Sequence, residues 1–254
     1  MAPTFGLCCE DAVGWLARLP AGSVDLVITD PPYESLEKHR SVGTTTRLKH
    51  SKASSNDWFS VFPNVRFANL FAQVYRVLKR DAHFYLFTDP ETMFVAKPIA
   101  ESVGFKFWKP LIWDKKWIGM GYHYRARYEA ILFFEKGRRR LANLGVPDII
   151  EAPRVHRGYP TEKPVAVASV LVGQSSCPGN VVADPFVGSG AFGVAAVAGG
   201  RHFVGADIKP EAIRIARERL ESAGARERET LVLHLPESGA RAVGSVAFGL
   251  DEIG

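Results

Sequence analysis

Short, mostly apolar runs recur along the chain and predict buried strands. Parallel strands that are covered by helices on both faces are apolar throughout, and five runs fit that description. They are residues 5–9, 24–29, 83–88, 181–184 and 202–207. Two further runs, residues 105–113 and 128–135, are aromatic and β-branched and flank a glycine-containing connection. We expect these two to pair as an antiparallel hairpin at one edge of the sheet.

Helical spacing alternates with these runs. Across residues 64–79 the apolar side chains fall on one helical face: Phe67, Leu70, Phe71, Val74, Val77 and Leu78. Residues 163–172 and 210–220 also predict helices, and Pro210 stands in the first turn of the second one. The alternation of strands and helices predicts an α/β fold with a doubly wound, mostly parallel sheet, seven-stranded when the hairpin is counted.

Length and composition favour a single globular domain. The chain has 254 residues, of which 46% are hydrophobic and 23% charged, and this suits one α/β domain with insertions. No apolar run approaches the roughly 18 residues of a membrane span, and no basic-then-apolar leader opens the chain. We therefore expect no membrane association. The three cysteines, Cys8, Cys9 and Cys177, are too few for a disulfide framework and lack zinc-site spacing, so we expect buried free thiols and no metal site.

Positive charge is modest overall but clustered. The formal net charge is +5. Two clusters could neutralise nucleic-acid phosphates, or could be solvated loops: Lys38, Arg40, Arg47, Lys49 and Lys52, and then Arg138, Arg139 and Arg140. The first lies in a long polar insertion, residues 34–62, of the length that is usually functional or mobile. Residues 137–158 form a second, shorter insertion, and residues 236–254 are a tail within a stretch rich in Gly, Ala and Ser.

The segment Asp30-Pro31-Pro32-Tyr33 directly follows a predicted strand. An exocyclic amine on a base is a poor nucleophile, and two acceptors aimed at its N–H bonds favour a tetrahedral nitrogen and take up the developing charge. Asp30 offers a carboxylate, and Pro31 offers a carbonyl whose direction is restricted by the following proline. Tyr33 offers a flat ring for a base extruded from a duplex. The segment therefore predicts methyl transfer to an amino group, and a simple tight turn is the alternative.

A second constellation, residues 184–190 with the sequence Asp-Pro-Phe-Val-Gly-Ser-Gly, follows the strand at 181–184 and opens a helix at Ala191. Glycines at such a turn let a ligand approach the backbone closely. Asp184 is placed to bind a cationic group such as the amino group of a methionine moiety, and Asp207, at the end of the next strand, can accept hydrogen bonds from ribose hydroxyls. A dinucleotide or phosphate site is the alternative. We take the segment to lack the Gly-x-Gly-x-x-Gly pattern, because Asp184 and Phe186 replace the usual apolar lead-in. An anionic residue before the loop also suits an ammonium better than a pyrophosphate.

Taken together, these segments resemble the permuted, β-class DNA amino-methyltransferases, in which the catalytic motif precedes the cofactor motif. The resemblance covers about residues 5–220 and includes residues 23–29, 75–79, 111–115, 127–132 and 159–164. It implies a Rossmann-like methyltransferase sheet, S-adenosylmethionine as cofactor and double-stranded DNA as partner. It also implies a homodimer in the cytoplasm of a prokaryotic or phage-infected cell.

The resemblance assigns roles to individual residues. The catalytic residues would be Asp30, Pro31, Pro32 and Tyr33. The cofactor-binding residues would be Asp11, Ala12, Asp30, Thr161, Lys163, Asp184, Pro185, Phe186, Gly188, Ser189, Gly190 and Asp207. Lys163 would pair with the methionine carboxylate, and Asp11 would lie beside the cofactor adenine. Asp rather than Ser before Pro-Pro-Tyr favours N6 of adenine over N4 of cytosine. An N4-cytosine enzyme of the same architecture and an inactive DNA-binding protein that kept the fold are the alternatives.

One departure from the family concerns base recognition. The family carries a target-recognition domain where this chain has only residues 137–158, too few for an independent core. We expect DNA contact to fall instead on the insertion at 34–62, on Arg138–140, or on a second subunit.

Overall fold

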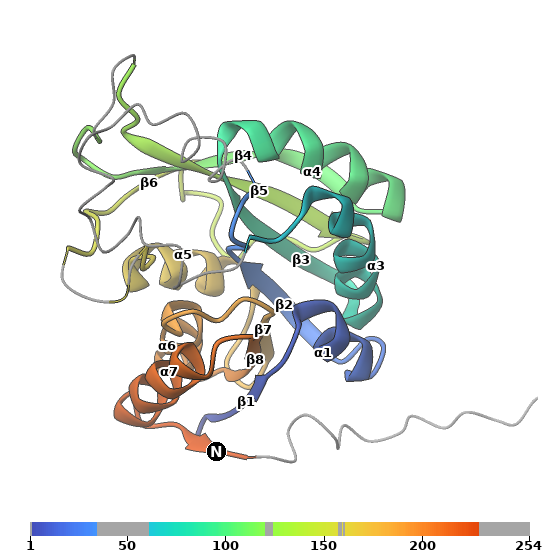
Figure 1. The fold of residues 1–254 in the computed structure, drawn as a ribbon, viewed down its shortest axis with the longest axis vertical. Helices are drawn as coiled ribbons and strands as arrows, with labels where there is room; N and C mark the ends of the chain where they lie inside the picture. The colour runs from blue at the N-terminus through green and yellow to red at the C-terminus, as the bar shows by residue number, and fades with distance from the viewer. Residues whose placement is uncertain (1, 35–60, 120–123, 157–158, 160, 229–254) are drawn as a thin grey trace, which may run out of the picture.

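The fold is a single sheet covered by helices on both faces (Figure 1). The computed structural model describes residues 2–34, 61–119, 124–156, 159 and 161–228. Within these residues the sheet has nine strands in the order β6-β4-β5-β3-β2-β7-β8-β1-β9. Strand β5 runs antiparallel to both of its neighbours, and the other paired strands are parallel.

The strands are β1 (Thr4–Cys9), β2 (Val24–Thr29), β3 (Leu78–Thr88), β4 (Lys106–Asp114), β5 (Tyr128–Lys136), β6 (Ile149–Glu151), β7 (Val181–Asp184), β8 (His202–Asp207) and β9 (Arg226–Glu227). The helices are α1 (Ala12–Arg18), α3 (Phe67–Val77), α4 (Pro90–Val103), α5 (Val165–Ser175), α6 (Ala191–Ala198) and α7 (Pro210–Ser222). A 3-10 turn, η2 (Asn64–Arg66), leads into α3.

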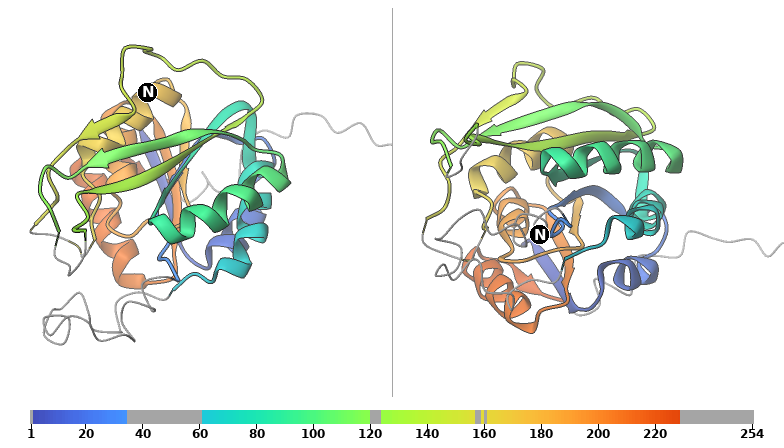
Figure 2. Two further views of the ribbon diagram at one scale, coloured as in Figure 1. Left: turned by 90° about the horizontal axis from the view of Figure 1, so that it is seen from above. Right: turned by 45° about the horizontal axis from the view of Figure 1, so that its top comes forward.

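Helices α1, α3 and α4 pack on one face of the sheet, and α5, α6 and α7 pack on the other (Figures 1 and 2). Strand β3 shows why both faces need cover, because its side chains alternate between two fully buried clusters. Phe84 and Leu86 lie in the cluster with α3 and α4, whereas Tyr85 and Phe87 lie in the cluster with α5 and α6. Burial of each such side chain stabilises the fold by roughly 1.5–3 kcal/mol.

The predicted fold class is confirmed, and the strand count is corrected. The seven longer strands are those predicted, and β2, β7 and β8 have the predicted bounds. Two short strands, β6 and β9, extend the sheet at its edges, so nine strands rather than seven lie in the described part of the chain. The predicted hairpin is present as β4 and β5, but β6 covers its outer edge.

The cysteines differ from the prediction. Cys9 and Cys177 are exposed and Cys8 is partly buried, with all three thiols free. Cys9 ends β1 at the point where the strand emerges from the sheet, and Cys177 lies in the turn after α5, so neither position faces the core. None of the described helices is both long and apolar enough to cross a bilayer.

The chain reverses its direction of winding between β2 and β7. From β2 it passes through α3 to β3 on one side, and from β7 it passes through α6 to β8 on the other. Open α/β sheets bind ligands in the crevice beyond the carboxyl ends of strands at such a switch point. Asp30 follows β2 and Asp184 ends β7, so both predicted motifs meet there.

Candidate active site

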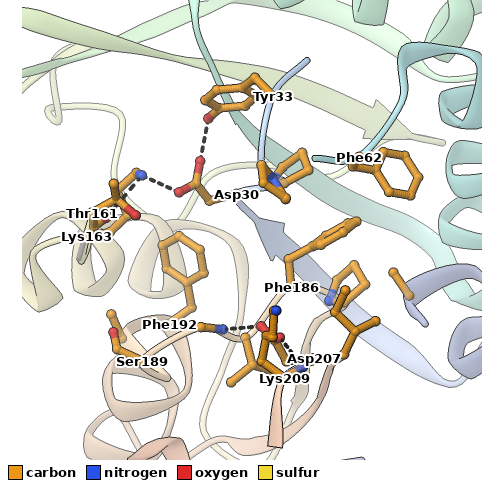
Figure 3. A pocket seen from close by; sticks show the side chains of 18 of the residues that line it. Asp30, Tyr33, Phe62, Thr161, Lys163, Phe186, Ser189, Phe192, Asp207 and Lys209 are labelled. Carbon is orange, nitrogen blue, oxygen red and sulfur yellow. Dashed lines mark hydrogen bonds and ion pairs between the residues drawn. The ribbon is translucent and has the colours of Figure 1, made fainter. Parts of the chain in front are cut away.

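A cavity of about 330 Å³ lies beyond the carboxyl ends of β2, β7 and β8 (Figure 3). Of the predicted site residues, those that line it are Asp11, Ala12, Asp30, Pro31, Pro32, Tyr33, Thr161, Lys163, Pro185, Phe186, Gly188, Ser189 and Asp207. The sequence thus predicted most of the wall, including segments more than 150 residues apart.

Both carboxylate oxygens of Asp30 accept hydrogen bonds in the cavity (Figure 3). One carboxylate oxygen, Oδ1, accepts a hydrogen bond from the hydroxyl of Tyr33. The other, Oδ2, accepts from the ammonium of Lys163. The backbone amide of Phe62 donates to the carbonyl of Pro32 at 2.8 Å, whereas within the described chain no backbone amide donates to the carbonyl of Pro31. Among the described residues, the Pro31 carbonyl beside Asp30 therefore keeps its capacity to accept a hydrogen bond.

Lys163 pairs with protein carboxylates. Its ammonium contacts Asp30 and lies 3.4 Å from Glu129, and its side chain is only 8% exposed. Glu129 in turn accepts from Lys115 at 2.7 Å. Burial opposes the charge of Lys163, but the carboxylates of Asp30 and Glu129 outweigh burial and raise its pKa. The four side chains thus form a row of alternating charges that ends at Asp30. Lys163 was predicted to pair with the carboxylate of the cofactor, whereas in this structure it pairs with the carboxylates of Asp30 and Glu129.

Asp184 and Gly190 lie beneath the cavity wall and do not line it. Asp184 is fully buried, and its Oδ1 accepts from the hydroxyl of Thr29 at 2.7 Å and from the amide of Phe186 at 2.9 Å. The bond between Thr29 and Asp184 joins the ends of β2 and β7. Burial raises the pKa of Asp184 to about 8. Its Oδ2 is buried and has no hydrogen-bond partner among the described residues.

The glycine-rich loop is fixed by close packing. Gly190 has φ +77°, and a Cβ there would lie 2.9 Å from the Cβ of Ala216 in α7. Gly193 stands three residues later, so the loop does have the Gly-x-Gly-x-x-Gly spacing, and a Cβ at Gly193 would lie 2.7 Å from the ring of Phe203. The spacing alone therefore does not separate this loop from a dinucleotide site. The acidic residue before it carries that distinction.

Asp207 and Asp11 each anchor a turn at the cavity rim. Asp207 accepts from the backbone amides of Gly188 and Lys209, both at 2.9 Å, and burial raises its pKa. Asp11 caps the amino end of α1 and also accepts from the guanidinium of Arg66 at 2.7 Å. The hydrogen bond from Arg66 is the main reason that the pKa of Asp11 is lowered.

Several cavity residues were not predicted. They are Val61, Phe62, Arg66, Glu129, Tyr159, Glu162, Val187, Ala191, Phe192, Ile208 and Lys209. Glu129 had a signal, because it lies in a segment that resembles the family, but no charge partner was visible in the sequence. Phe62 had none, because its contact with the catalytic segment depends on the path of the chain between residues 34 and 61.

The two basic clusters have different outcomes. The first, Lys38 to Lys52, lies outside the described residues, and its contact with DNA stays a prediction. The second follows β5, whose last residue, Lys136, pairs with Ala82, six residues before the carboxyl end of β3 at Thr88. Arg138–140 therefore lie at the opposite end of the strands from Asp30, and the structure does not bring them to the cavity.

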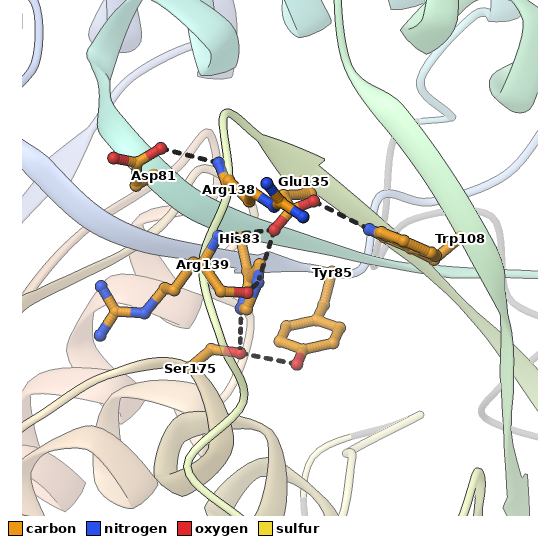
Figure 4. A network of polar contacts seen from close by, with 8 residues as sticks. All are labelled: Asp81, His83, Tyr85, Trp108, Glu135, Arg138, Arg139 and Ser175. Atoms are coloured by element: carbon orange, nitrogen blue, oxygen red, sulfur yellow. Dashed lines mark hydrogen bonds and ion pairs between the residues drawn. The ribbon is translucent and has the colours of Figure 1, made fainter. Parts of the chain in front are cut away.

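A buried polar network holds this second cluster (Figure 4). Glu135 accepts from the indole of Trp108 at 3.0 Å and from the amide of Arg139 at 2.6 Å. The ring of His83 contacts the hydroxyl of Ser175 at 2.7 Å and the carbonyl of Arg139 at 3.2 Å. The backbone of Arg139 is thus bound to buried side chains of β3 and β5 and helps to hold the segment that follows β5 against the sheet.

The sheet order and the two loops at the switch point define an α/β methyltransferase. The family model for DNA methylases of the N6 and N4 type matches residues 24–218. The chain therefore belongs to this family of DNA methyltransferases, and the predicted family is confirmed.

Individual relatives and solved structures that are similar to the chain include DNA methyltransferases. The chain is 28% identical to the type II methyltransferase M.HpaI of Haemophilus parainfluenzae over 244 residues, covering 85% of this chain and 74% of the relative. It is 28% identical to the DNA adenine methyltransferase YhdJ of Escherichia coli (strain K12) over 261 residues, covering 87% and 84%.

Among solved structures, the complex of M1.HpyAVI with its cofactor SAM has a TM-score of 0.64 at 19% identity, covering 85% of this chain and all of the other. The cytosine-N4-specific PvuII DNA methyltransferase has a TM-score of 0.66 at 14% identity, covering 88% and 91%. These likenesses show the shared fold.

Proposed function

We propose that this chain transfers a methyl group from S-adenosylmethionine to N6 of adenine in duplex DNA. The observation that carries the proposal is the position of Asp30 and Pro31. Both line the cavity at the end of β2, directly across the switch point from the glycine-rich loop after β7. A base amine and a methyl donor can therefore meet there.

The described residues fit S-adenosylmethionine. The cavity has apolar walls from Phe186 and Phe192 for an aromatic base, and the Asp207 carboxylate at its rim for ribose hydroxyls. Beneath the wall, Asp184 accepts a hydrogen bond from the amide of Phe186 and so positions the loop that lines the cavity. When bound, the cofactor supplies an electrophilic methyl group on a sulfonium.

The target amine would be held between two acceptors. The Asp30 carboxylate would accept one N–H bond and the Pro31 carbonyl the other, which favours a tetrahedral nitrogen with an available lone pair. Methyl transfer would leave a positive charge on that nitrogen, and Asp30 Oδ1 would stabilise this charge and take the proton. In the structure Tyr33 donates to this same oxygen. Binding of the amine would therefore displace the Tyr33 hydroxyl and release its ring to stack on the extruded base.

Two features support adenine as the target. Asp stands before Pro-Pro-Tyr, as in the N6 branch that the sequence resembles. YhdJ, to which the chain is 28% identical, is named as a DNA adenine methyltransferase. The N4-cytosine alternative shares the chemistry and differs in the base that the cavity accepts. The proposed homodimer and cytoplasmic location rest on the resemblance.

The proposal is tested by transfer of labelled methyl groups from S-adenosylmethionine to unmethylated duplex DNA. The wild type is expected to label the DNA. Asp30→Ala is expected to lose at least a hundredfold in rate, in line with removal of one preorganised charge-stabilising group. The circular-dichroism spectrum and the thermal unfolding midpoint of the same variant serve as the control for folding. Labelling that Asp30→Ala leaves unchanged would refute the assignment of Asp30.

A further inference from the structure

The turn of the β4–β5 hairpin exposes aromatic side chains to solvent. Trp117 is 76% exposed and Tyr124 is fully exposed, with Tyr128 at 47% and Ile118 at 44%. These four residues belong to the described parts of the turn, 115–119 and 124–127, and to the first residue of β5. Neighbouring exposed apolar groups mark an interaction site more often than isolated ones do. We call these four residues the hairpin surface.

The hairpin surface stands on an ordered backbone. Beyond the last ladder pair, the amide of Lys115 donates to the carbonyl of Arg127 at 2.9 Å, and that of Gly119 donates to Ala126 at 2.7 Å. The Arg127 guanidinium grips the Asp114 carboxylate with two hydrogen bonds of 2.7 and 2.6 Å. These bonds fix the backbone on either side of the exposed aromatic residues before binding, which lowers the entropic cost of binding.

Exposed basic residues lie in the turn and in the segment that follows β6. Lys116 and Arg127 are exposed and pair with Glu151 and Asp114. Arg125 and Arg154 are also exposed, and neither has a carboxylate partner among the described residues. Basic side chains interleaved with exposed aromatic rings suit a polyanion that carries flat bases.

The hairpin surface and the cavity lie at the same end of the strands. Tyr128 directly precedes Glu129, which lines the cavity. Lys115, at the base of the turn, pairs with Glu129, and Glu129 lies 3.4 Å from Lys163, which pairs with Asp30. A duplex delivering a base to Asp30 would therefore pass beside the turn.

Given the proposed function, on which this inference rests, we infer that the hairpin surface binds the duplex next to the target base. Trp117 and Tyr124 stack on bases that lose a neighbour when the target leaves the helix, and Arg125 and Arg154 contact phosphates. Side chains inserted at disturbed base steps commonly compensate for lost stacking. This surface lies next to the cavity, whereas Arg138–140 follow the far end of β5.

The test compares Trp117→Ala, Tyr124→Ala and the double variant with the wild type. Affinity for a fluorescein-labelled mixed-sequence duplex is measured by anisotropy, and cofactor binding by calorimetry. Each single variant is expected to lose about tenfold in DNA affinity, and the double variant about a hundredfold, with cofactor affinity unchanged. Trp108→Ala is the matched control, because Trp108 is 53% exposed at the other end of the same hairpin. It is expected to bind DNA within about twofold of the wild type.

Other results overturn the inference in distinguishable ways. If the wild type methylates DNA and the double variant binds and methylates equally well, the hairpin inference fails and the proposed function stands. If the double variant turns a dimer into a monomer in sedimentation and keeps its DNA affinity, the hairpin surface is an interface between two copies. If the wild type binds cofactor but labels no DNA, the proposed function itself fails.

Discussion

His83 is expected to make the fold sensitive to mild acid. Its ring is fully buried in the middle of β3, where it contacts Ser175, the carbonyl of Arg139 and, at 3.8 Å, the Glu135 carboxylate (Figure 4). Burial lowers its pKa to about 4, from an ordinary value near 6.5. Replacement by Gln removes the ionisable group while retaining a side chain that can form hydrogen bonds.

The size of the effect follows from the pKa difference. Between pH 6.5 and pH 4 the unfolded chain binds a proton that folded His83 does not, so stability falls as the pH falls through this window. A shift from 6.5 to about 4 corresponds to roughly 3 kcal/mol in total, of which about 2 kcal/mol is lost between pH 7 and pH 5.

The assay is urea unfolding at pH 7 and pH 5. The wild type is expected to lose about 2 kcal/mol more between the two pH values than His83→Gln loses. The exposed His156 offers a control, and His156→Gln should follow the wild type. Parallel losses for wild type and His83→Gln would refute the reasoning, because they would mean that His83 can take up a proton in the folded state.

Three further variants probe the site itself. Gly190→Ala should destabilise the fold by roughly 2–4 kcal/mol in thermal unfolding, because it adds strain at a positive φ to a 2.9 Å clash, whereas Gly22→Ala, with positive φ but open space, should show only the smaller strain. Without cofactor, the stability of the wild type should decline as the pH rises from about 4 to about 8, because the buried carboxyl of Asp184 keeps its proton to higher pH than the unfolded one does. Asp184→Asn should remove this decline, and a decline of equal size in the variant would contradict the reasoning. Glu129→Gln should lower kcat more than it raises KM for DNA, because Lys163 would then neutralise Asp30 more strongly; a change in KM alone would exclude a positioning role.

The sequence predicted the parts of the site that depend on local order along the chain. Asp30 and Asp184 were placed correctly, because each stands at the carboxyl end of an apolar strand and such ends meet at a switch point. Helices α1 and α4 were not predicted, although Asp11 and Asp89 cap them, since their apolar stripes are short or interrupted. A proline, Pro98, interrupts the pattern of α4.

The parts that the sequence did not show depend on which side chains meet across the fold. Nothing in the local sequence shows that Lys163 pairs with Asp30 and Glu129, residues 133 and 34 positions away. Arg138–140 were predicted to contact DNA because of their charge. The antiparallel direction of β5 places them at the end of the strands opposite the cavity, and their contact with DNA stays a prediction. The hairpin surface was not recognised because exposed aromatic residues in a strand-rich segment look like core residues until burial is known.

The identity of the methylated nucleoside tests the central claim most directly. Unmethylated genomic DNA is incubated with the wild type or Asp30→Ala and labelled S-adenosylmethionine, then digested to nucleosides and separated by chromatography with mass detection. We expect the label in N6-methyldeoxyadenosine from the wild type and none above background from Asp30→Ala. Label in N4-methyldeoxycytidine, or no enzyme-dependent label at all, would contradict the account.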